Sequence, residues 1–454
     1  MGYNRGGFHH QADIRECCAV TDAPGKCVSI KNLGQALFNS PLQLSLEPGF
    51  GRGRFVPEGL WIREEVEWPA PSDGLLFEKA GPRQKLYFNP RHVRAAIVTC
   101  GGLCPGINNV IRSLFMELHY RYGVAEVLGI RHGYWGLTEN GPPPITLTRD
   151  FVNTIHKEGG TMLGTSRGHQ DPAAMVDFLA KRKIDVLFCV GGDGTQRGNR
   201  ALGEEAERRG LKVAIVGVPK TIDNDLLYCD RTFGFVTALE KAQEVIHLAH
   251  TEAVAATRGI GLVRLMGREA GFIACGAAVV SQEVNFVLIP ELPFQLCGEG
   301  GLLESIRMRM RDRGHAVIVA AEGAGQHLFA DDCGADASGN RKFHDIGLHL
   351  KEQIVDYFKR LNEPVDVKYI DPSYIIRSVP ADVDDAWLCD RLARNAVHAA
   401  MAGKTELIIG TLNGKPIHVP LSLAVEKKKQ VDLEGDLWAS VLACTGQPAS
   451  FGPV

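Results

Sequence analysis

The chain has 454 residues, of which 45% are hydrophobic and 23% are charged. These values are ordinary for a globular enzyme, and the length predicts two or three domains. A formal net charge of −3 excludes the overall basic field with which many proteins bind nucleic acid or anionic membranes.

The sequence carries no recognisable membrane or export segment. Its apolar runs stay below the 18 or so residues that span a bilayer. The first residues lack the apolar core of a secretory signal, and the last residues, FGPV, match neither a prenylation box nor a peroxisomal tripeptide. The 12 cysteines are scattered, which predicts reduced thiols in a cytoplasmic protein. Cys100 and Cys104 lack the second pair of ligands that a zinc site needs.

The first 93 residues are rich in glycine, proline and mixed polar residues, and we expect an irregular N-terminal extension there. We expect neither His9-His10 nor the acidic run at 331–336 to be a binding site, since both are typical of solvated segments. From Arg94 onward, short β-branched runs alternate with segments of helical period, as in βα units on a parallel sheet. The expected strands are 95–99, 127–130, 185–190, 213–218, 261–265, 285–289, 316–320 and 365–370.

Between these strands, apolar residues recur at spacings of three and four, which predicts helices. The clearest lie near residues 110–118, 239–253, 346–361 and 384–401. Two later strand-like runs, 407–411 and 416–419, flank Asn413-Gly414, a strong hairpin signal. We therefore predict an α/β fold with at least two open parallel sheets, in which ligands bind at the carboxyl ends of the strands.

The run GGLCPG at 101–106 follows the first expected strand and precedes a helix. Glycines allow the backbone to approach a ligand, and a helix N-terminus offers unpaired N–H groups to an anion. A tight strand-to-helix turn would have the same composition. This run alone therefore leaves phosphate binding and a plain turn equally open.

The run GGDGT at 191–195 follows the strand at 185–190 and precedes helix-like residues 196–209. An acidic residue between glycines suits a Mg²⁺ ion that keeps its waters while the backbone cradles phosphates. The alternative is that Asp193 only caps the helix. The same run occurs in lipid and NAD kinases, so it indicates phosphate chemistry rather than one enzyme.

The run PKTIDND at 219–225 also comes straight after a strand and places two carboxylates, a hydroxyl and a lysine on one loop. Phosphoryl transfer to an alcohol needs a carboxylate that accepts the hydroxyl proton and cations that balance phosphate charge. A turn with a solvated edge is the alternative. We favour the site, because such a turn gains little from a buried apolar strand before it.

The run MGREAG at 266–271 follows the strand at 261–265. Arg268 offers a planar donor fork to a phosphate, or to charge that develops in a transition state. A surface ion pair with Glu269 would use the same residues. This run alone therefore leaves a phosphate site and a surface pair equally open.

One further run, Gly403-Lys404-Thr405, imitates the end of a nucleotide-binding P-loop. His398 stands where that motif requires a glycine, and the run follows a helix rather than a strand. We predict a helix C-terminal glycine with a lysine beside it, and no nucleotide site.

Taken together, these runs resemble the phosphofructokinase family in its longer form, found in plants and some protists. The resemblance covers about residues 94–420. It is carried by GGLCPGINNVIR, GGDGTQRG, VPKTIDND, FGFVTALEKAQE, RLMGREAGFIA, AEGAGQ and KYIDPSYIIR. The order of these seven runs, more than any single one, identifies the family.

The resemblance implies in-line transfer of the γ-phosphoryl group of Mg·ATP to fructose 6-phosphate. Asp223 resembles the base that takes the proton of the sugar 1-hydroxyl, Thr221 and Asp225 support it, and Asp193 matches the magnesium position. The other residues that the resemblance implies are Lys220 and Arg268 for catalysis; Gly102, Arg167, Gly192, Gly194, Thr195 and Gly198 for the nucleotide; and Thr221, Asp223, Met266, Gly267, Arg268, Glu322, Lys368, Tyr374 and Arg377 for the sugar phosphate.

Two residues bear on the phosphoryl donor. Pyrophosphate-using relatives resemble GGDD at the second run, where the added aspartate would collide with and repel the α-phosphate of a nucleotide; this chain has Gly194. Those relatives also carry a lysine at the position of Lys220, where bacterial ATP enzymes have glycine. We favour ATP, because a steric block is harder to evade than an extra cation. Pyrophosphate remains the alternative donor.

The resemblance also implies two Rossmann-like domains with the active site in the cleft between them. Residues 94–235 with about 377–420 would bind the nucleotide, 236–376 would bind the sugar phosphate, and 421–454 would form a C-terminal segment. A homotetramer with effector sites at subunit interfaces is the family's usual assembly. An inactive regulatory subunit is a second alternative. A lipid or NAD kinase is a third, although it would leave PKTIDND and MGRE unexplained.

Overall fold

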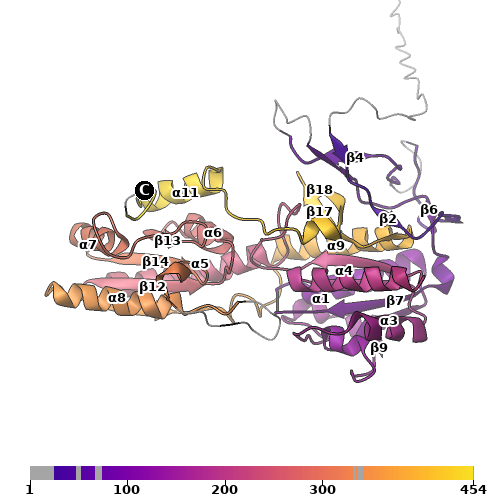
Figure 1. Cartoon of the computed structure of the whole chain (residues 1–454), viewed down its shortest axis with the longest axis horizontal. Coiled ribbons are helices and arrows are strands. Elements are labelled where there is room, and N and C mark those ends of the chain that lie inside the picture. The colour runs from indigo at the N-terminus through magenta and orange to yellow at the C-terminus, as the bar shows by residue number, and fades with distance from the viewer. Residues whose placement is uncertain (1–24, 48–52, 67–73, 331–333, 335–340, 453–454) are drawn as a thin grey trace, which may run out of the picture.

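The computed structural model describes residues 25–47, 53–66, 74–330, 334 and 341–452. His9, His10 and the run at 331–336 apart from Gly334 lie outside the described residues. Two open parallel sheets, each flanked by helices, lie side by side along the long axis of the molecule (Figure 1). The predicted α/β fold is therefore confirmed. Within the described ranges, no helix is both long and apolar enough to cross a bilayer.

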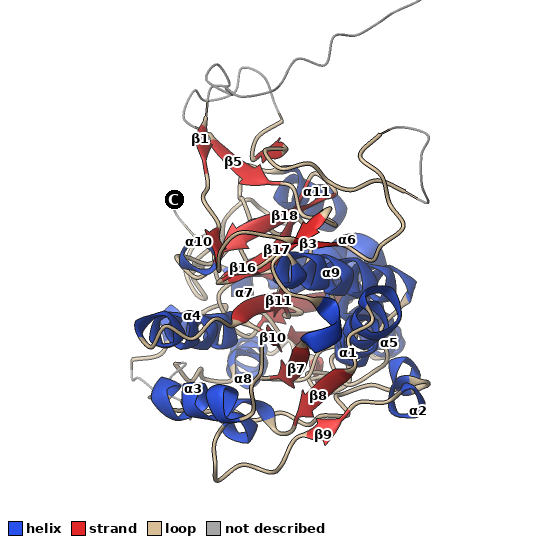
Figure 2. Ribbon diagram, turned by 90° about the vertical axis from the view of Figure 1, so that its right-hand side faces the viewer, coloured by secondary structure: helices blue, strands red, loops and turns tan. Residues whose placement is uncertain are grey.

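The larger sheet has seven strands in the order β18-β17-β11-β10-β7-β8-β9, antiparallel only at its β17–β18 and β8–β9 edges. Alternate residues of β7 face opposite sides. Ile97 lies in one core with residues of α1 and α9, whereas Val98 lies in another with residues of α3 and α4. The two pairs of helices cover opposite faces of the sheet (Figure 2). The elements are β7 (Arg94–Thr99), β8 (Glu126–Ile130), β9 (Ile145–Thr146), β10 (Val186–Gly191), β11 (Ala214–Pro219), β17 (Leu407–Leu412), β18 (Lys415–Pro420), α1 (Ile107–Met116), α2 (Arg149–Val152), α3 (Pro172–Lys181), α4 (Asp193–Arg208) and α9 (Val383–Met401).

The smaller sheet has four parallel strands in the order β13-β14-β12-β15. Leu262 of β12 is buried with α7 and α8, whereas the next residue, Val263, shares the core that holds α5, α6, α1 and α9. Because that core reaches both sheets, the two halves share one interior. The elements are β12 (Gly259–Leu265), β13 (Phe286–Leu288), β14 (Ala316–Ala321), β15 (Asp366–Ile370), α5 (Phe235–Ala255), α6 (Phe272–Ser281), α7 (Leu302–Arg313) and α8 (Ile346–Arg360).

The chain after β18 leaves the larger sheet and returns to the smaller one. It passes through α10 (Leu421–Ala424) and ends with α11 (Asp436–Thr445), which packs on α6 (Figure 1). The side-chain oxygen of Gln447 accepts a hydrogen bond from the Val287 N–H at 2.7 Å, and Phe451 is buried in the core of the smaller sheet. The sequence patterns did not predict this crossing.

The eight strands expected between residues 94 and 370 lie within two residues of the observed ones. The β17–β18 turn uses Asn413 and Gly414 at φ of 51° and 68°, the left-handed conformations that a two-residue hairpin turn needs. One predicted boundary was wrong, because the helix expected from residue 196 begins at Asp193. Gly192 takes the N-cap position, so Asp193 lies in the first helical turn, where the helix dipole favours a carboxylate.

The described part of the N-terminal extension is less irregular than expected, because it forms short strands along the larger sheet (Figure 1). Phe77 is buried against Ile417 of β18, and β2 pairs with β16 just after α9. Gly403, at φ of 82°, follows the end of α9 as predicted. The strands are β1 (Lys26–Cys27), β2 (Lys31–Asn32), β3 (Phe38–Asn39), β4 (Trp61–Arg63), β5 (Leu75–Glu78), β6 (Lys85–Leu86) and β16 (Lys404–Thr405).

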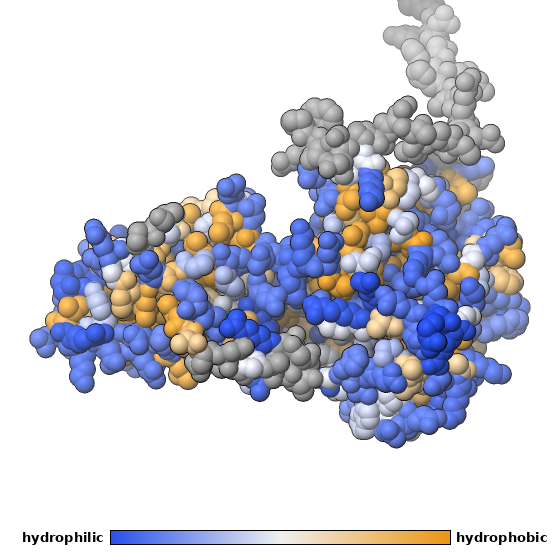
Figure 3. Space-filling model, viewed as in Figure 1, coloured by the Kyte–Doolittle hydropathy of each residue, from blue (hydrophilic) through white to orange (hydrophobic). Residues whose placement is uncertain are grey.

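A buried ion cluster joins the extension to the larger sheet. Glu78 of β5 lies 2.7 Å from Arg83 and 2.9 Å from Lys404, and all three side chains are buried. In the space-filling view, apolar side chains gather over both halves of the molecule, while the strip between the halves is mainly polar (Figure 3). Charged side chains in the interior, such as those of this cluster, are tolerated only when they are paired with opposite charges.

Glu78→Ala should lower the free energy of unfolding by about 3–5 kcal/mol, because it removes the buried carboxylate of two buried cations and leaves them the exposed Glu58 as partner. Chemical denaturation followed by tryptophan fluorescence measures this loss. The matched control is Glu139→Ala, whose partner Lys181 is exposed and whose loss should cost less than about 1 kcal/mol. Equal losses in the two variants would contradict the importance of the buried cluster.

Candidate active site

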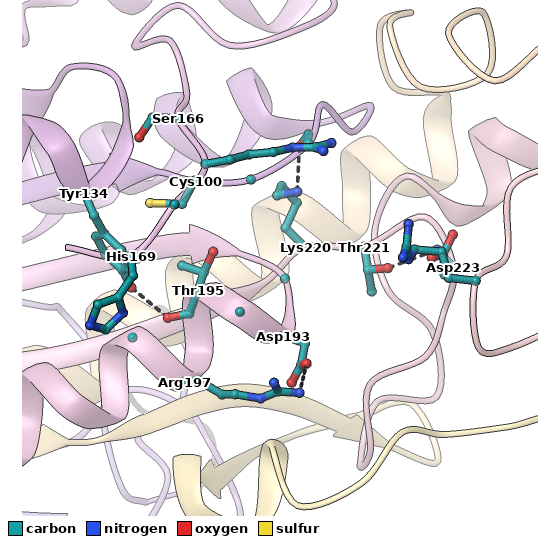
Figure 4. A pocket seen from close by; sticks show the side chains of 18 of the residues that line it. Cys100, Tyr134, Ser166, His169, Asp193, Thr195, Arg197, Lys220, Thr221 and Asp223 are labelled. Carbon is teal, nitrogen blue, oxygen red and sulfur yellow. Dashed lines mark hydrogen bonds and ion pairs between the residues drawn. The ribbon is translucent and has the colours of Figure 1, made fainter. Parts of the chain in front are cut away.

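A cavity of about 610 Å³ lies between the two sheets. Its wall is formed by the loops that follow β7, β10 and β11 of the larger sheet and β12 of the smaller one, and Figure 4 shows part of it. The runs GGLCPG, GGDGT, PKTIDND and MGREAG all contribute residues. Four segments that are far apart in the sequence therefore meet at one site, at the carboxyl ends of their strands.

The loop after β11 is held by its own side chains. The Thr221 hydroxyl accepts a hydrogen bond from the Asp223 N–H and donates one to the Asp225 carboxylate, both at 3.0 Å. Asn224 adopts a left-handed conformation at φ of 55°, and its side-chain oxygen accepts from the Thr232 N–H at 3.0 Å. Asparagine tolerates this conformation better than most residues. The loop therefore presents Asp223 to the cavity in a fixed position.

Asp223 is the most electrostatically unusual group of the site. Its Oδ1 atom is buried and accepts no hydrogen bond from the described chain. Burial raises the pKa of this carboxyl, and the negative charges of Asp225 and Glu322 raise it further, against the opposing effect of Lys428 and Arg268. Asp223 is thus a carboxyl group of raised basicity with a free acceptor atom.

The second run is placed by β10 and α4. Asp193, in the first turn of α4, forms a close ion pair with Arg197 (Figure 4). A β-carbon added at Gly194 would meet no atom within 4 Å, so the space in front of this residue is open. The next residue, Thr195, is fixed by Tyr134, whose hydroxyl donates to the Thr195 carbonyl at 2.7 Å.

Cationic groups converge on the first run. The buried Lys220 ammonium donates to the Gly102 carbonyl at 2.7 Å, and burial lowers the pKa of this lysine. A β-carbon at Gly102 would lie 3.6 Å from the guanidinium nitrogens of both Arg167 and Arg377. The loop therefore carries a concentration of positive charge suited to an anion.

The smaller sheet supplies Met266 and Arg268 to the cavity wall. The Arg268 guanidinium lies 4.7 Å above the Phe343 ring and donates to the Arg341 carbonyl. Glu322, at the end of β14, lies 3.6 Å from Arg264, and burial raises the pKa of its carboxyl. A carboxylate and several guanidiniums of this half thus stand near the loop that carries Asp223.

Most of the residues predicted from the sequence line this one cavity: Gly102, Arg167, Gly192, Asp193, Gly194, Thr195, Gly198, Lys220, Thr221, Asp223, Asp225, Met266, Arg268 and Arg377. Gly267, Glu322, Lys368 and Tyr374, all in the described part of the chain, lie outside the cavity wall. Lys368 pairs with Asp366 at 3.0 Å on β15, and the exposed Tyr374 ring lies 5.0 Å from the Arg377 guanidinium. Their predicted contact with a sugar phosphate stays a prediction.

Sequence reasoning missed several side chains of the wall, among them Tyr134, Arg341 and Lys428. Lys428 pairs closely with Asp225 and lies 3.9 Å from the Asp193 carboxylate. The only signal for it in the sequence is the run of three lysines at 427–429. Tyr134 and Arg341 stand in segments without a recognisable motif.

A metal ion could be held at the Asp193 end of the cavity. The Asp193 carboxylate lines the cavity and would be the ligand, although Arg197 and Lys428 face the same oxygen and would compete with a metal ion for it. Within the described ranges, no three acidic, histidine or cysteine side chains form a preformed metal cage. A Mg²⁺ ion that is bound through one or two carboxylates and substrate phosphates does not require such a cage.

Comparison with known proteins gives consistent results. The sequence model described as Phosphofructokinase matches residues 94–400. An ATP-dependent 6-phosphofructokinase of Borreliella burgdorferi is 47% identical over 93% of this chain and 97% of its own length. The ATP-dependent 6-phosphofructokinase of Trypanosoma brucei brucei is 46% identical over 84% of this chain and 78% of its own.

Solved structures agree on the fold. A pyrophosphate-dependent phosphofructokinase from Marinobacter aquaeolei superposes with a TM-score of 0.62 at 21% identity, over 80% of this chain and 93% of its own. A phosphofructokinase from Pichia pastoris in the T-state gives a TM-score of 0.61 at 22% identity, over 78% of this chain and 37% of its own. At these identities the likeness supports the fold alone.

Asp225→Asn should lower the pKa of the Asp223 carboxyl. The substitution removes the nearest negative charge and leaves Lys428 less compensated, and both changes favour the ionised form of Asp223. Carboxyl-carbon NMR of selectively labelled aspartates over a pH series measures the shift. Asp390→Asn, on α9 outside the cavity wall and hydrogen-bonded to Ser113 of α1, is the control and should leave Asp223 unchanged. An unchanged or raised pKa in Asp225→Asn would contradict the electrostatic coupling.

Proposed function

The chain belongs to the phosphofructokinase family, and we propose that it transfers the γ-phosphoryl group of ATP to the 1-hydroxyl of fructose 6-phosphate. The products are fructose 1,6-bisphosphate and ADP. The observation that carries this proposal is the Asp223 carboxylate, which lines the cavity with a buried oxygen that accepts no hydrogen bond from the described chain. Such an oxygen is free to accept the proton of a substrate hydroxyl.

In the proposed reaction, the 1-hydroxyl oxygen attacks the γ-phosphorus in line with the leaving oxygen of ADP. As the new oxygen–phosphorus bond forms, Asp223 takes the hydroxyl proton, and its raised pKa makes it a better base than an ordinary carboxylate. Thr221 and Asp225 hold the loop in position. Arg268 faces the same cavity from the smaller sheet and balances charge on the transferring group.

We propose that Asp193 holds Mg²⁺ together with the phosphates of ATP. One observation supports this position: the carboxylate lies in the cavity wall, beside the open space at Gly194. When bound there, Mg²⁺ would neutralise phosphate charge and ease departure of ADP. Gly102, Arg167, Gly192, Gly194, Thr195 and Gly198 would contact the nucleotide, and Lys220 the phosphates.

ATP is the favoured donor, with pyrophosphate as the alternative. The open space in front of Gly194 supports a bulky donor, and the relatives with 45–49% identity are named ATP-dependent. Lys220, which a pyrophosphate enzyme would also carry, is engaged with the Gly102 carbonyl and leaves the space at Gly194 open. An inactive regulatory subunit is disfavoured, because the acidic and cationic groups of the reaction all line one cavity.

We also propose that residues 94–235 and about 377–420 bind ATP while residues 236–376 bind the sugar phosphate, with Met266, Gly267, Glu322, Lys368, Tyr374 and Arg377 among the contacts. A cytoplasmic homotetramer fits two observations. Four large side chains, Tyr374, Ile375, Val383 and Trp387, are largely exposed and suit burial against another copy. The cysteines of the described ranges are free thiols, as expected in a reducing compartment.

Asp223→Asn should lower kcat by about 10²–10⁴-fold, because the amide keeps the shape of the side chain but cannot take the proton. Binding of fructose 6-phosphate should stay largely intact, since a base acts in the transition state. Steady-state kinetics and calorimetric titration of the sugar phosphate measure the two quantities. Full turnover in this variant would reject Asp223 as the base.

Gly194→Asp should raise the KM for ATP by about tenfold or more, because like charges in contact cost several kcal/mol. The KM for fructose 6-phosphate should change little. Gly194→Ala is the matched control: its β-carbon enters open space without charge and should leave the KM for ATP near that of the parent. An unchanged KM for ATP in the aspartate variant would contradict the claim that Gly194 is needed for ATP to bind.

A further inference from the structure

The segment at 428–431, which follows α10, is held between the two halves of the site. On one side, Lys428 forms an isolated antiparallel bridge with Leu226, and the Lys429 N–H donates to the Asp225 carbonyl at 3.0 Å. On the other side, the Gln430 side chain donates to the Glu269 carbonyl at 3.3 Å. One short stretch of chain is thus attached both to the PKTIDND loop and to the MGREAG loop.

A shared carboxylate strengthens the second attachment. Glu291 Oε1 accepts the Val431 N–H at 2.9 Å and the Gly271 N–H also at 2.9 Å. The backbone that follows Lys428 is therefore fixed by hydrogen bonds. The Lys428 side chain therefore extends toward the cavity from a backbone position that is held in place, unlike the side chain of a mobile surface lysine.

The Lys428 ammonium lies among the carboxylates of the site. It pairs closely with Asp225 and lies 3.9 Å from Asp193, and the lysine lines the cavity with its side chain 23% exposed. Arg197, the other cation on Asp193, also lines the cavity but is 61% exposed. In the described part of the chain, Lys428 is the cation that links the GGDGT loop to the PKTIDND loop.

A divalent ion at Asp193 and the Lys428 ammonium would seek the same oxygen and would repel each other. The repulsion between a divalent ion and the ammonium is reduced when a further negative charge lies between them. The phosphates of ATP supply that charge, and they would enter this cavity. The Lys428 ammonium therefore has carboxylates as its partners in the empty site and would have the phosphates of ATP as its partners in the loaded site.

We propose that Lys428 is a phosphate-binding cation of the active site, which neutralises Asp193 and Asp225 in the empty enzyme and transfers to the donor phosphates when metal and nucleotide bind. This inference rests on the proposed function. It deepens that function by adding a residue from the C-terminal segment to the catalytic machinery. No covalent step is involved, since the lysine changes only its ion-pair partners.

The competition is tested first without turnover. Mn²⁺ binding to the nucleotide-free enzyme is measured by electron paramagnetic resonance in the parent, Lys428→Met, Lys428→Gln and Lys428→Arg. The two uncharged variants should bind Mn²⁺ at least several-fold more tightly, because the competing cation is gone, whereas the arginine variant should resemble the parent. Lys427→Met, at the exposed neighbouring lysine, is the control and should also resemble the parent.

Turnover is measured on the same proteins with ATP and fructose 6-phosphate. Lys428→Met and Lys428→Gln should lose about 10²–10³-fold in kcat, as expected when one preorganised group that stabilises the transition state is removed. Lys428→Arg should recover part of that loss. Lys428→Gln can still donate a hydrogen bond to Asp225, so it keeps the test valid if the methionine variant does not fold.

A purely structural lysine would give a different pattern. If the uncharged variants bind Mn²⁺ no more tightly than the parent, or keep the parent's kcat, the inference is wrong. If the parent itself does not phosphorylate fructose 6-phosphate, the proposed function fails instead. The Mn²⁺ comparison then still decides whether Lys428 competes for the carboxylates.

Discussion

Four carboxyl groups, Asp193, Asp223, Asp225 and Glu322, are brought close together where the two sheets meet, and their mutual repulsion is the constraint on which the site depends. Burial raises the pKa of Asp223, and the negative charges of Asp225 and Glu322 raise it further. The repulsion between the carboxylates is offset by cations from separate parts of the chain. These cations include the guanidiniums of the smaller sheet and one lysine near the C-terminus. The position of each cation is in turn set by a strand end, a helix turn or a hydrogen-bonded loop.

The fold holds these charged groups in fixed positions relative to one another. The central strands of the larger sheet run in register, so the loops after β7, β10 and β11 emerge at one edge. The core around α5 and α6 reaches both sheets, which holds the MGREAG loop opposite that edge. The segment before α11 closes the arrangement, because it is hydrogen-bonded to the loops of both halves. The fold therefore determines where the charged groups of the site lie.

Much of this arrangement could be predicted from the sequence, because it depends on local signals. Local patterns predict local structure in the apolar strand runs, the Asn413-Gly414 turn and the glycine-rich loops. The carboxyl ends of parallel strands also necessarily lie at one edge of their sheet. The start of α4 was misplaced, because the GGDGT run looks like a loop until Gly192 is seen to cap the helix. Lys428 and the pairing of Glu78 with Arg83 and Lys404 were missed for another reason. Their roles depend on contacts between residues far apart in the sequence, which no short pattern records.

The most direct test of the central claim is a coupled assay of fructose 1,6-bisphosphate formation by the unmodified protein, with Mg²⁺ and fructose 6-phosphate, in which ATP and pyrophosphate are offered separately. We expect turnover with ATP and essentially none with pyrophosphate. Turnover with pyrophosphate alone would contradict the role given to the open space at Gly194, while leaving the base and the sugar site in place. Absence of turnover with either donor would contradict the assignment of catalysis to this cavity.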